Sequence, residues 1–67
     1  MRVLGIDPGT AIVGWGILDV EGSRFQHHAS GHIATKSTLT ISERISEISH
    51  DLREIILRYA PNEASVE

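Results

Sequence analysis

The sequence lacks cysteine altogether, and it holds only two prolines and no long apolar run. The absence of cysteine excludes disulfide scaffolds, thiolate zinc sites and cysteine nucleophiles. No stretch approaches the roughly 20 apolar residues that a membrane-crossing helix needs, and residues 1–5 are too few for a signal peptide. We therefore expect a soluble, cytoplasmic protein that makes no membrane contact.

Basic residues are also scarce, with six Lys and Arg against nine Asp and Glu and a net charge of -3. This charge balance is not typical of a protein that binds nucleic acid through its own basic surface. A DNA partner would have to be reached through metal ions or through sequence beyond these residues. Apolar residues make up 40% of the chain and charged residues 22%, which excludes intrinsic disorder. With 67 residues, at most one small globular domain is expected.

Three extended segments are predicted in the first half of the chain. Residues 3–6 form a short apolar run that stops at the turn-forming sequence Asp7-Pro8-Gly9-Thr10. Residues 12–20 are rich in Ile and Val and end at a second turn, and residues 24–35 form the third extended segment. Because short turns join the three strands, they must be antiparallel neighbours.

The segment after the third strand has the apolar spacing of an amphipathic helix. Seven apolar residues recur mostly at steps of three and four, as on the buried face of an amphipathic helix: Ile41, Ile45, Ile48, Leu52, Ile55, Ile56 and Tyr59. Thr40 is the expected N-cap, and Glu43 completes a capping-box pattern. Pro61 removes a backbone donor, so the helix is expected to end near Tyr59.

The helix is long enough to cross a sheet, and the six residues after Pro61 would then enter a fourth strand parallel to an earlier one. This predicts an α/β fold: a mixed sheet of three antiparallel strands, one crossover helix and the start of a fourth, parallel strand. Such a set has too little apolar surface to offset the entropy of ordering the chain. We therefore expect residues 1–67 to be the amino-terminal part of a single domain whose carboxyl-terminal part is missing.

Asp7 is the first candidate for a functional residue. It ends an apolar strand, where a carboxylate is costly unless it is solvated, paired or bound to a metal. The simplest alternative is that Asp7-Pro8-Gly9 is only a hairpin turn. Gly14 and Gly16 favour a site, because residues two apart face the same side of a strand and missing side chains there admit close approach.

Glu67 is the second candidate, although a solvated tail residue is its plainest interpretation. At the end of a strand parallel to the first it would lie beside Asp7, since neighbouring strands are about 4.8 Å apart. Two such carboxylates can share a hard cation such as Mg²⁺, and a pair of these ions can activate a water and stabilise the leaving oxygen of a phosphodiester. We predict Asp7 and Glu67 as metal ligands in an incomplete set. No convincing third ligand is found among the remaining acids: Asp19, Glu21, Glu43, Glu47, Asp51, Glu54 and Glu63.

The four histidines are predicted to be structural or exposed. His27 and His28 are adjacent on a strand, so their side chains point to opposite faces and cannot easily chelate one ion. His32 is more ambiguous and is assigned a structural role. Residues 36–38, Lys-Ser-Thr, could touch phosphate, but a polar loop before a helix cap explains them equally well.

The chain as a whole resembles the amino-terminal part of the RuvC family of Holliday junction resolvases, which share the ribonuclease H-like fold. The combination of motifs is far more specific than any one of them. The matching segments follow the family's order and spacing over nearly the whole chain: Gly5-Ile6-Asp7-Pro8-Gly9, Gly14-Trp15-Gly16-Ile17, Gly31-His32-Ile33-Ala34-Thr35, the helix from Thr40 to Tyr59, and Pro61 through Val66-Glu67.

The resemblance implies a homodimeric endonuclease, with two Mg²⁺ ions in each complete site, that cuts four-way DNA junctions by paired symmetric nicks. It also implies branch-migration motor proteins as partners. Asp7 matches the family's first-strand metal-binding aspartate, and Glu67 matches its fourth-strand glutamate. The two remaining catalytic aspartates of the family belong to a later helix that these residues lack, so the segment alone is expected to be inactive.

Three alternatives stay open at this point. A Gly-Ile-Asp-x-Gly-Thr opening also occurs in actin, sugar kinases and heat-shock chaperones, which would make the chain part of an ATP-binding phosphotransferase or ATPase. A resolvase-like family associated with ribosomal RNA processing has a similar opening strand and turn. The segment Gly14-Trp15-Gly16 and the acid after the helix oppose the first alternative, and Pro8 with residues 31–35 opposes the second. A non-catalytic interaction fragment is the third.

Overall fold

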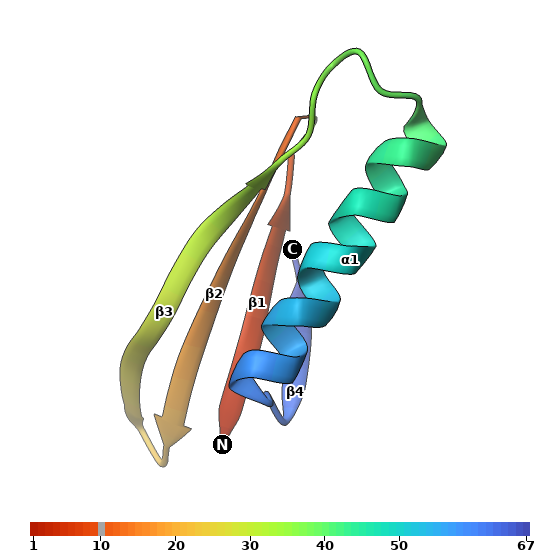
Figure 1. The fold of residues 1–67 in the computed structure, drawn as a ribbon. Coiled ribbons are helices and arrows are strands. Elements are labelled where there is room, and N and C mark those ends of the chain that lie inside the picture. The colour runs from red at the N-terminus through yellow and green to blue at the C-terminus, as the bar shows by residue number, and fades with distance from the viewer. Residues whose placement is uncertain (10) are drawn as a thin grey trace.

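A four-stranded sheet and one helix make up the computed structural model, which describes residues 1–9 and 11–67 (Figure 1). Thr10, the last residue of the turn expected after the first strand, lies outside the described residues. Asp7 and Pro8 belong to the first strand itself, so the strand runs two residues further than its apolar run indicates. The elements are β1 (Arg2–Pro8), β2 (Ile12–Glu21), β3 (Arg24–Ala34), α1 (Ile41–Tyr59) and β4 (Glu63–Val66).

The sheet is mixed, with the strand order β3-β2-β1-β4. β2 is antiparallel to both β1 and β3, because tight turns connect these strands in sequence. β4 runs parallel to β1, with Val3 opposite Glu63 and Ile6 opposite Val66. The helix makes the crossover between β3 and β4 and lies in front of the sheet in Figure 1. The predicted topology of three antiparallel strands, a crossover helix and a parallel fourth strand is confirmed.

The hairpin between β2 and β3 depends on one glycine. Gly22 has a φ of 62°, which a side chain would disfavour, and it supplies the positive φ of a two-residue turn. Further along this hairpin the register shifts between Ile17 and Leu18, which lie opposite Ala29 and His27. His28 is therefore an extra residue on β3, a β-bulge that changes which histidine faces which side of the sheet.

The buried core is small and belongs to the sheet, consisting of Leu4, Val13, Ile17 and Ile33. The expectation that the helix buries its whole apolar face is wrong, because α1 contributes no buried residue. Ile41 and Ile45, in its first two turns, are 74% and 59% exposed. Figure 1 shows the reason: α1 diverges from the sheet toward its amino-terminal end, so only its later turns lie against the strands.

Both ends of α1 lie where the sequence predicts, and both are capped. The Glu43 amide donates to Thr40 Oγ1 at 3.2 Å, and the Thr40 amide donates to Glu43 Oε1 at 3.1 Å, which confirms the capping box. The helix stops at Tyr59, and Ala60 adopts a left-handed conformation with its amide donating to Ile56 O at 2.9 Å. In the described residues, α1 lacks the apolarity that crossing a membrane requires.

Arg2 joins the last turn of the helix to the sheet. Its Nε and Nη2 donate to the two carboxylate oxygens of Asp19 at 2.8 and 3.3 Å, and its Nη1 donates to Tyr59 O at 2.8 Å. The hydrogen bond from Arg2 lowers the pKa of Asp19 below its ordinary value. Beside this group, the rings of Trp15 and Tyr59 are 5.8 Å apart. These contacts hold the last turn of α1 against one face of the sheet.

Candidate active site

The sheet face away from the helix carries the candidate site. Arg2 contacts Tyr59, so Arg2, Leu4 and Ile6 face the helix, and the alternate residues of β1 face the other way. A groove lies on this second face, and residues from all four strands or their ends line it. No residue of α1 takes part in the lining of this groove. Asp7 and Glu67 are both among its lining residues.

Glycines form the floor of the groove. Gly5 lies opposite Gly16 on the neighbouring strand, and Gly14 lies opposite Asp7. A Cβ built on Gly5 or Gly16 would have no heavy atom nearer than 4.0 or 3.9 Å, so the space above these residues is open. The expectation that Gly14 and Gly16 share a face and leave room for a close approach is therefore consistent with the groove.

The structure brings the backbones of Asp7 and Glu67 side by side. Ile6 of β1 is paired with Val66 of β4. Asp7 is the next residue after Ile6, and Glu67 is the next residue after Val66. The Glu67 amide donates to Ile6 O at 3.0 Å, which extends the parallel ladder by one more bond. Neighbouring strands are about 4.8 Å apart, so the two side chains start from adjacent positions at the same edge of the sheet.

Both carboxylates are exposed, and neither makes a salt bridge or a side-chain hydrogen bond to another described residue. Two adjacent carboxylates open to solvent form a donor set of hard oxygen ligands, which is the set that Mg²⁺ prefers. Within residues 1–9 and 11–67, no three or more His, Cys, Asp and Glu side chains gather closely enough to hold a metal ion. The assignment of Asp7 and Glu67 as metal ligands stays a prediction, and their adjacent positions are consistent with it.

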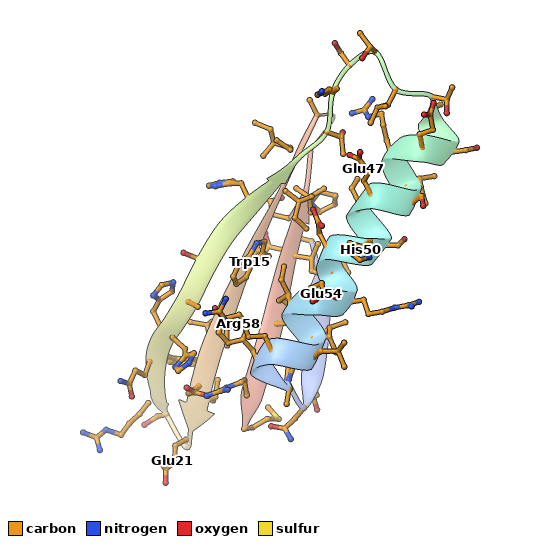
Figure 2. The ribbon with its side chains drawn as sticks, viewed as in Figure 1. Trp15, Glu21, Glu47, His50, Glu54 and Arg58 are labelled. Carbon is orange, nitrogen blue, oxygen red and sulfur yellow. The ribbon has the colours of Figure 1, made fainter. Side chains whose placement is uncertain are left out.

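The other acidic residues lie elsewhere. Asp19 is committed to the pair with Arg2 on the helix side of the sheet. Figure 2 shows Glu47, His50 and Glu54 along the helix, on the side of the sheet opposite the groove. Glu63 is at the other end of β4 from Glu67, opposite Val3. None of these side chains lines the groove.

His32 is a residue of the groove that the sequence analysis assigned to a structural role. It lies opposite Gly14, and Gly14 lies opposite Asp7, so the three occupy one row across β3, β2 and β1. This row can be predicted from the sequence only if the register between β2 and β3 is known. The bulge in β3 shifts that register, so counting residues from the hairpin turn gives the wrong pairing. His28, by contrast, packs edge-on against Tyr59 and lies 3.5 Å from Asp19 on the helix side.

Comparison with protein families gives a match along nearly the whole chain. The family model described as crossover junction endodeoxyribonuclease RuvC matches residues 3–67. The chain is 45% identical over 67 residues to the crossover junction endodeoxyribonuclease RuvC of Gluconobacter oxydans and covers 40% of that protein. It is 52% identical over 68 residues to that of Prochlorococcus marinus and covers 44% of it. The chain thus spans about two-fifths of the length of the curated relatives it matches.

A comparison of structures agrees with the sequence match. The Thermus thermophilus RuvC in complex with a Holliday junction substrate superimposes with a TM-score of 0.87 and 30% sequence identity. The superposition covers 98% of this chain and 42% of that one. The mixed sheet and helix are therefore part of a ribonuclease H-like fold, as expected from the sequence motifs.

Proposed function

Since the chain belongs to the RuvC family of crossover junction endodeoxyribonucleases, we propose that the protein of which it forms part cuts four-way DNA junctions. The observation that carries this proposal is the placement of Asp7 and Glu67 at adjacent strand ends beside an open groove. The Thermus relative bound to a Holliday junction supports the choice of substrate. Cutting by this protein is a hydrolysis of phosphodiester bonds, for which two carboxylates at one edge of a sheet are suited.

Magnesium is the proposed cofactor, with two ions in each complete site and with Asp7 and Glu67 among their ligands. Bound Mg²⁺ would lower the pKa of an attacking water and stabilise the charge on the leaving oxygen. The chain's own contribution is to hold two carboxylates in register through the parallel pairing of β1 with β4. The remaining ligands would come from sequence beyond these residues, because the described part of the chain offers no third one near the pair.

Assembly and location follow from the proposed substrate. A four-way junction is resolved by two symmetric nicks, and two nicks call for two active sites, so we propose a homodimer. We further propose action in the cytoplasm, where bacterial DNA lies, together with branch-migration motor proteins. With a net charge of -3, residues 1–67 are not the main phosphate-binding surface, and basic residues elsewhere in the full-length protein would hold the arms of the junction.

The alternative functions have less support. An ATPase of the actin-like kind would use the turn after β1 to hold phosphates, and the family match gives no support for it. The same match favours junction DNA over precursor RNA as the substrate. An assay that offers ATP, precursor RNA and junction DNA to one preparation would separate the three functions.

The proposal is tested by removing one carboxylate at a time in the full-length protein. Asp7→Asn and Glu67→Gln keep the shape of each side chain but remove its negative charge, so cutting of a synthetic four-way junction in Mg²⁺ should fall roughly 100- to 1,000-fold or more. Junction binding, measured by gel shift or anisotropy, should persist, because the carboxylates repel DNA phosphates.

Glu63→Gln is the matched control. Glu63 lies on the same strand, has the same charge and is exposed, but it stands at the opposite end of β4 from Glu67. This variant should cut at nearly the normal rate. A normal cutting rate in Asp7→Asn would overturn the assignment of Asp7 and, with it, the proposed site.

A further inference from the structure

His32 occupies the far side of the groove from Glu67. Asp7, Gly14 and His32 form one row across three strands, and Glu67 continues this row beyond Asp7. With strands about 4.8 Å apart, the backbone of His32 is about 10 Å from that of Asp7. A phosphate group bound next to the two carboxylates would bridge this separation.

Gly14 makes the space between the two side chains. A Cβ on Gly14 would be 3.9 Å from Asp7 Cβ and 3.8 Å from His32 Cδ2, so the two side chains flank the glycine directly. Any larger residue would fill the gap that the backbone leaves open. Asp7 and His32 are therefore the walls of a slot with a glycine floor, and both line the same groove.

The chemistry of His32 suits an anion better than a magnesium ion. An imidazole carries at least one N–H in either protonation state, so it can always donate a hydrogen bond. Mg²⁺ takes oxygen ligands, which the neighbouring carboxylates supply. His32 is exposed and makes no hydrogen bond, ion pair or ring contact with another described residue, so its N–H groups are not committed within this part of the chain.

From this arrangement we infer that His32 binds the phosphate that is cut, by donating a hydrogen bond to one of its non-bridging oxygens from the side opposite Glu67. The inference rests on the proposed function and names a substrate contact within the same site. His32 thereby fixes the position of the phosphate between the two carboxylates and the third strand. No bond to carbon, phosphorus or metal is formed by the imidazole in this role.

The test compares His32→Phe, which keeps a flat ring but has no donor, with His32→Gln, which keeps a donor. In the full-length protein, single-turnover cutting of a four-way junction should slow roughly 10- to 100-fold in His32→Phe and be partly restored in His32→Gln. His27→Phe is the control, since His27 is on the same strand, opposite Leu18, about 16 Å along it. This control should cut at the normal rate.

A second measurement separates a direct contact from a structural effect. Junctions with sulfur in place of either non-bridging oxygen at the cut phosphate weaken hydrogen bonds to that oxygen. For one of the two diastereomers, sulfur should slow wild type several-fold more than it slows His32→Phe, because that variant has already lost the contact. The slowing should persist when Mn²⁺ replaces Mg²⁺, since the oxygen is held by the imidazole.

The outcomes are distinct. Equal cutting rates in wild type and His32→Phe would overturn the inference and leave the proposed function standing. Equal sulfur effects in the two proteins for both diastereomers, or full restoration by Mn²⁺, would also overturn it, because the oxygen would then belong to a metal. A wild-type protein that cuts no junction would overturn the proposed function and the His32 contact together.

Discussion

Gly31 is a position inside the sheet where an added methyl group should harm the fold. It lies opposite Trp15 on the neighbouring strand. A Cβ on Gly31 would come within 2.9 Å of Trp15 Cζ2 and 3.0 Å of both Cε2 and Nε1. The indole ring therefore rests on the bare backbone of Gly31, and it cannot move away freely because its other neighbour is the Tyr59 ring, 5.8 Å away.

The magnitude of the effect follows from these contacts. Overpacking of this kind costs about 1–3 kcal/mol, whereas replacing glycine by alanine recovers about 0.4–1 kcal/mol through the unfolded state. We therefore expect Gly31→Ala to lower the free energy of unfolding by about 1–2 kcal/mol. Urea unfolding of the full-length protein, followed by far-ultraviolet circular dichroism, measures this change as a lower midpoint at constant slope.

Gly16→Ala is the matched control, since a Cβ there would meet nothing nearer than Ala29 O at 3.9 Å. Its stability should equal or slightly exceed that of wild type. The double variant Trp15→Leu with Gly31→Ala tests the cause, because without the indole the added methyl group should cost little. If Gly31→Ala proved as stable as Gly16→Ala, the stacking of Trp15 on Gly31 would be refuted as a packing constraint.

Two further predictions concern the contacts that hold the helix. Thr40→Ala removes the side-chain acceptor of the capping box, so it should lower the free energy of unfolding by about 1 kcal/mol, as measured by chemical denaturation. Thr38→Ala, in the loop before the helix, is the control and should leave stability unchanged. An equal loss in both variants would contradict the capping role. The pKa of Asp19 is lowered because Arg2 donates a hydrogen bond to its carboxylate. The ion pair therefore stabilises the fold above the ordinary carboxyl pKa near 3.8, and this stabilisation is lost as the pH falls through the lower pKa of Asp19 in the folded protein. The stability difference between wild type and Asp19→Asn should therefore shrink as the pH falls below about 4, and a difference that grows in acid would contradict the ion pair.

The sequence was sufficient to predict the relative placement of the two candidate ligands, because local patterns decide that geometry. Asp7 and Glu67 each follow an apolar strand segment, and a parallel crossover necessarily brings two such strand ends to one edge of the sheet. The capping pair of Thr40 and Glu43 is likewise local. These features need only the order of elements, which hydrophobic periodicity and turn residues reveal.

Features that depend on register between distant strands could not be predicted. His32 reaches the groove because the pairing of β2 with β3 sets it opposite Gly14, and the bulge at His28 makes that pairing irregular. Asp19 lies within the predicted second strand, but only the register of β2 on β1 shows that it pairs with Arg2. The exposure of Ile41 and Ile45 depends on the angle between helix and sheet, which an amphipathic pattern does not specify.

The position of β4 at the border of the sheet has a consequence for the proposed metal site. β4 is bonded to β1 over a ladder of four residue pairs, and in the described residues no strand pairs with its other side. In the proposed site, the spacing between the Asp7 and Glu67 carboxylates therefore depends on a strand that is held from one side in the described residues. Affinity and selectivity for a small cation depend on how rigidly the ligands are held. A further strand joining this border would stiffen the spacing, so metal affinity would be coupled to completion of the sheet.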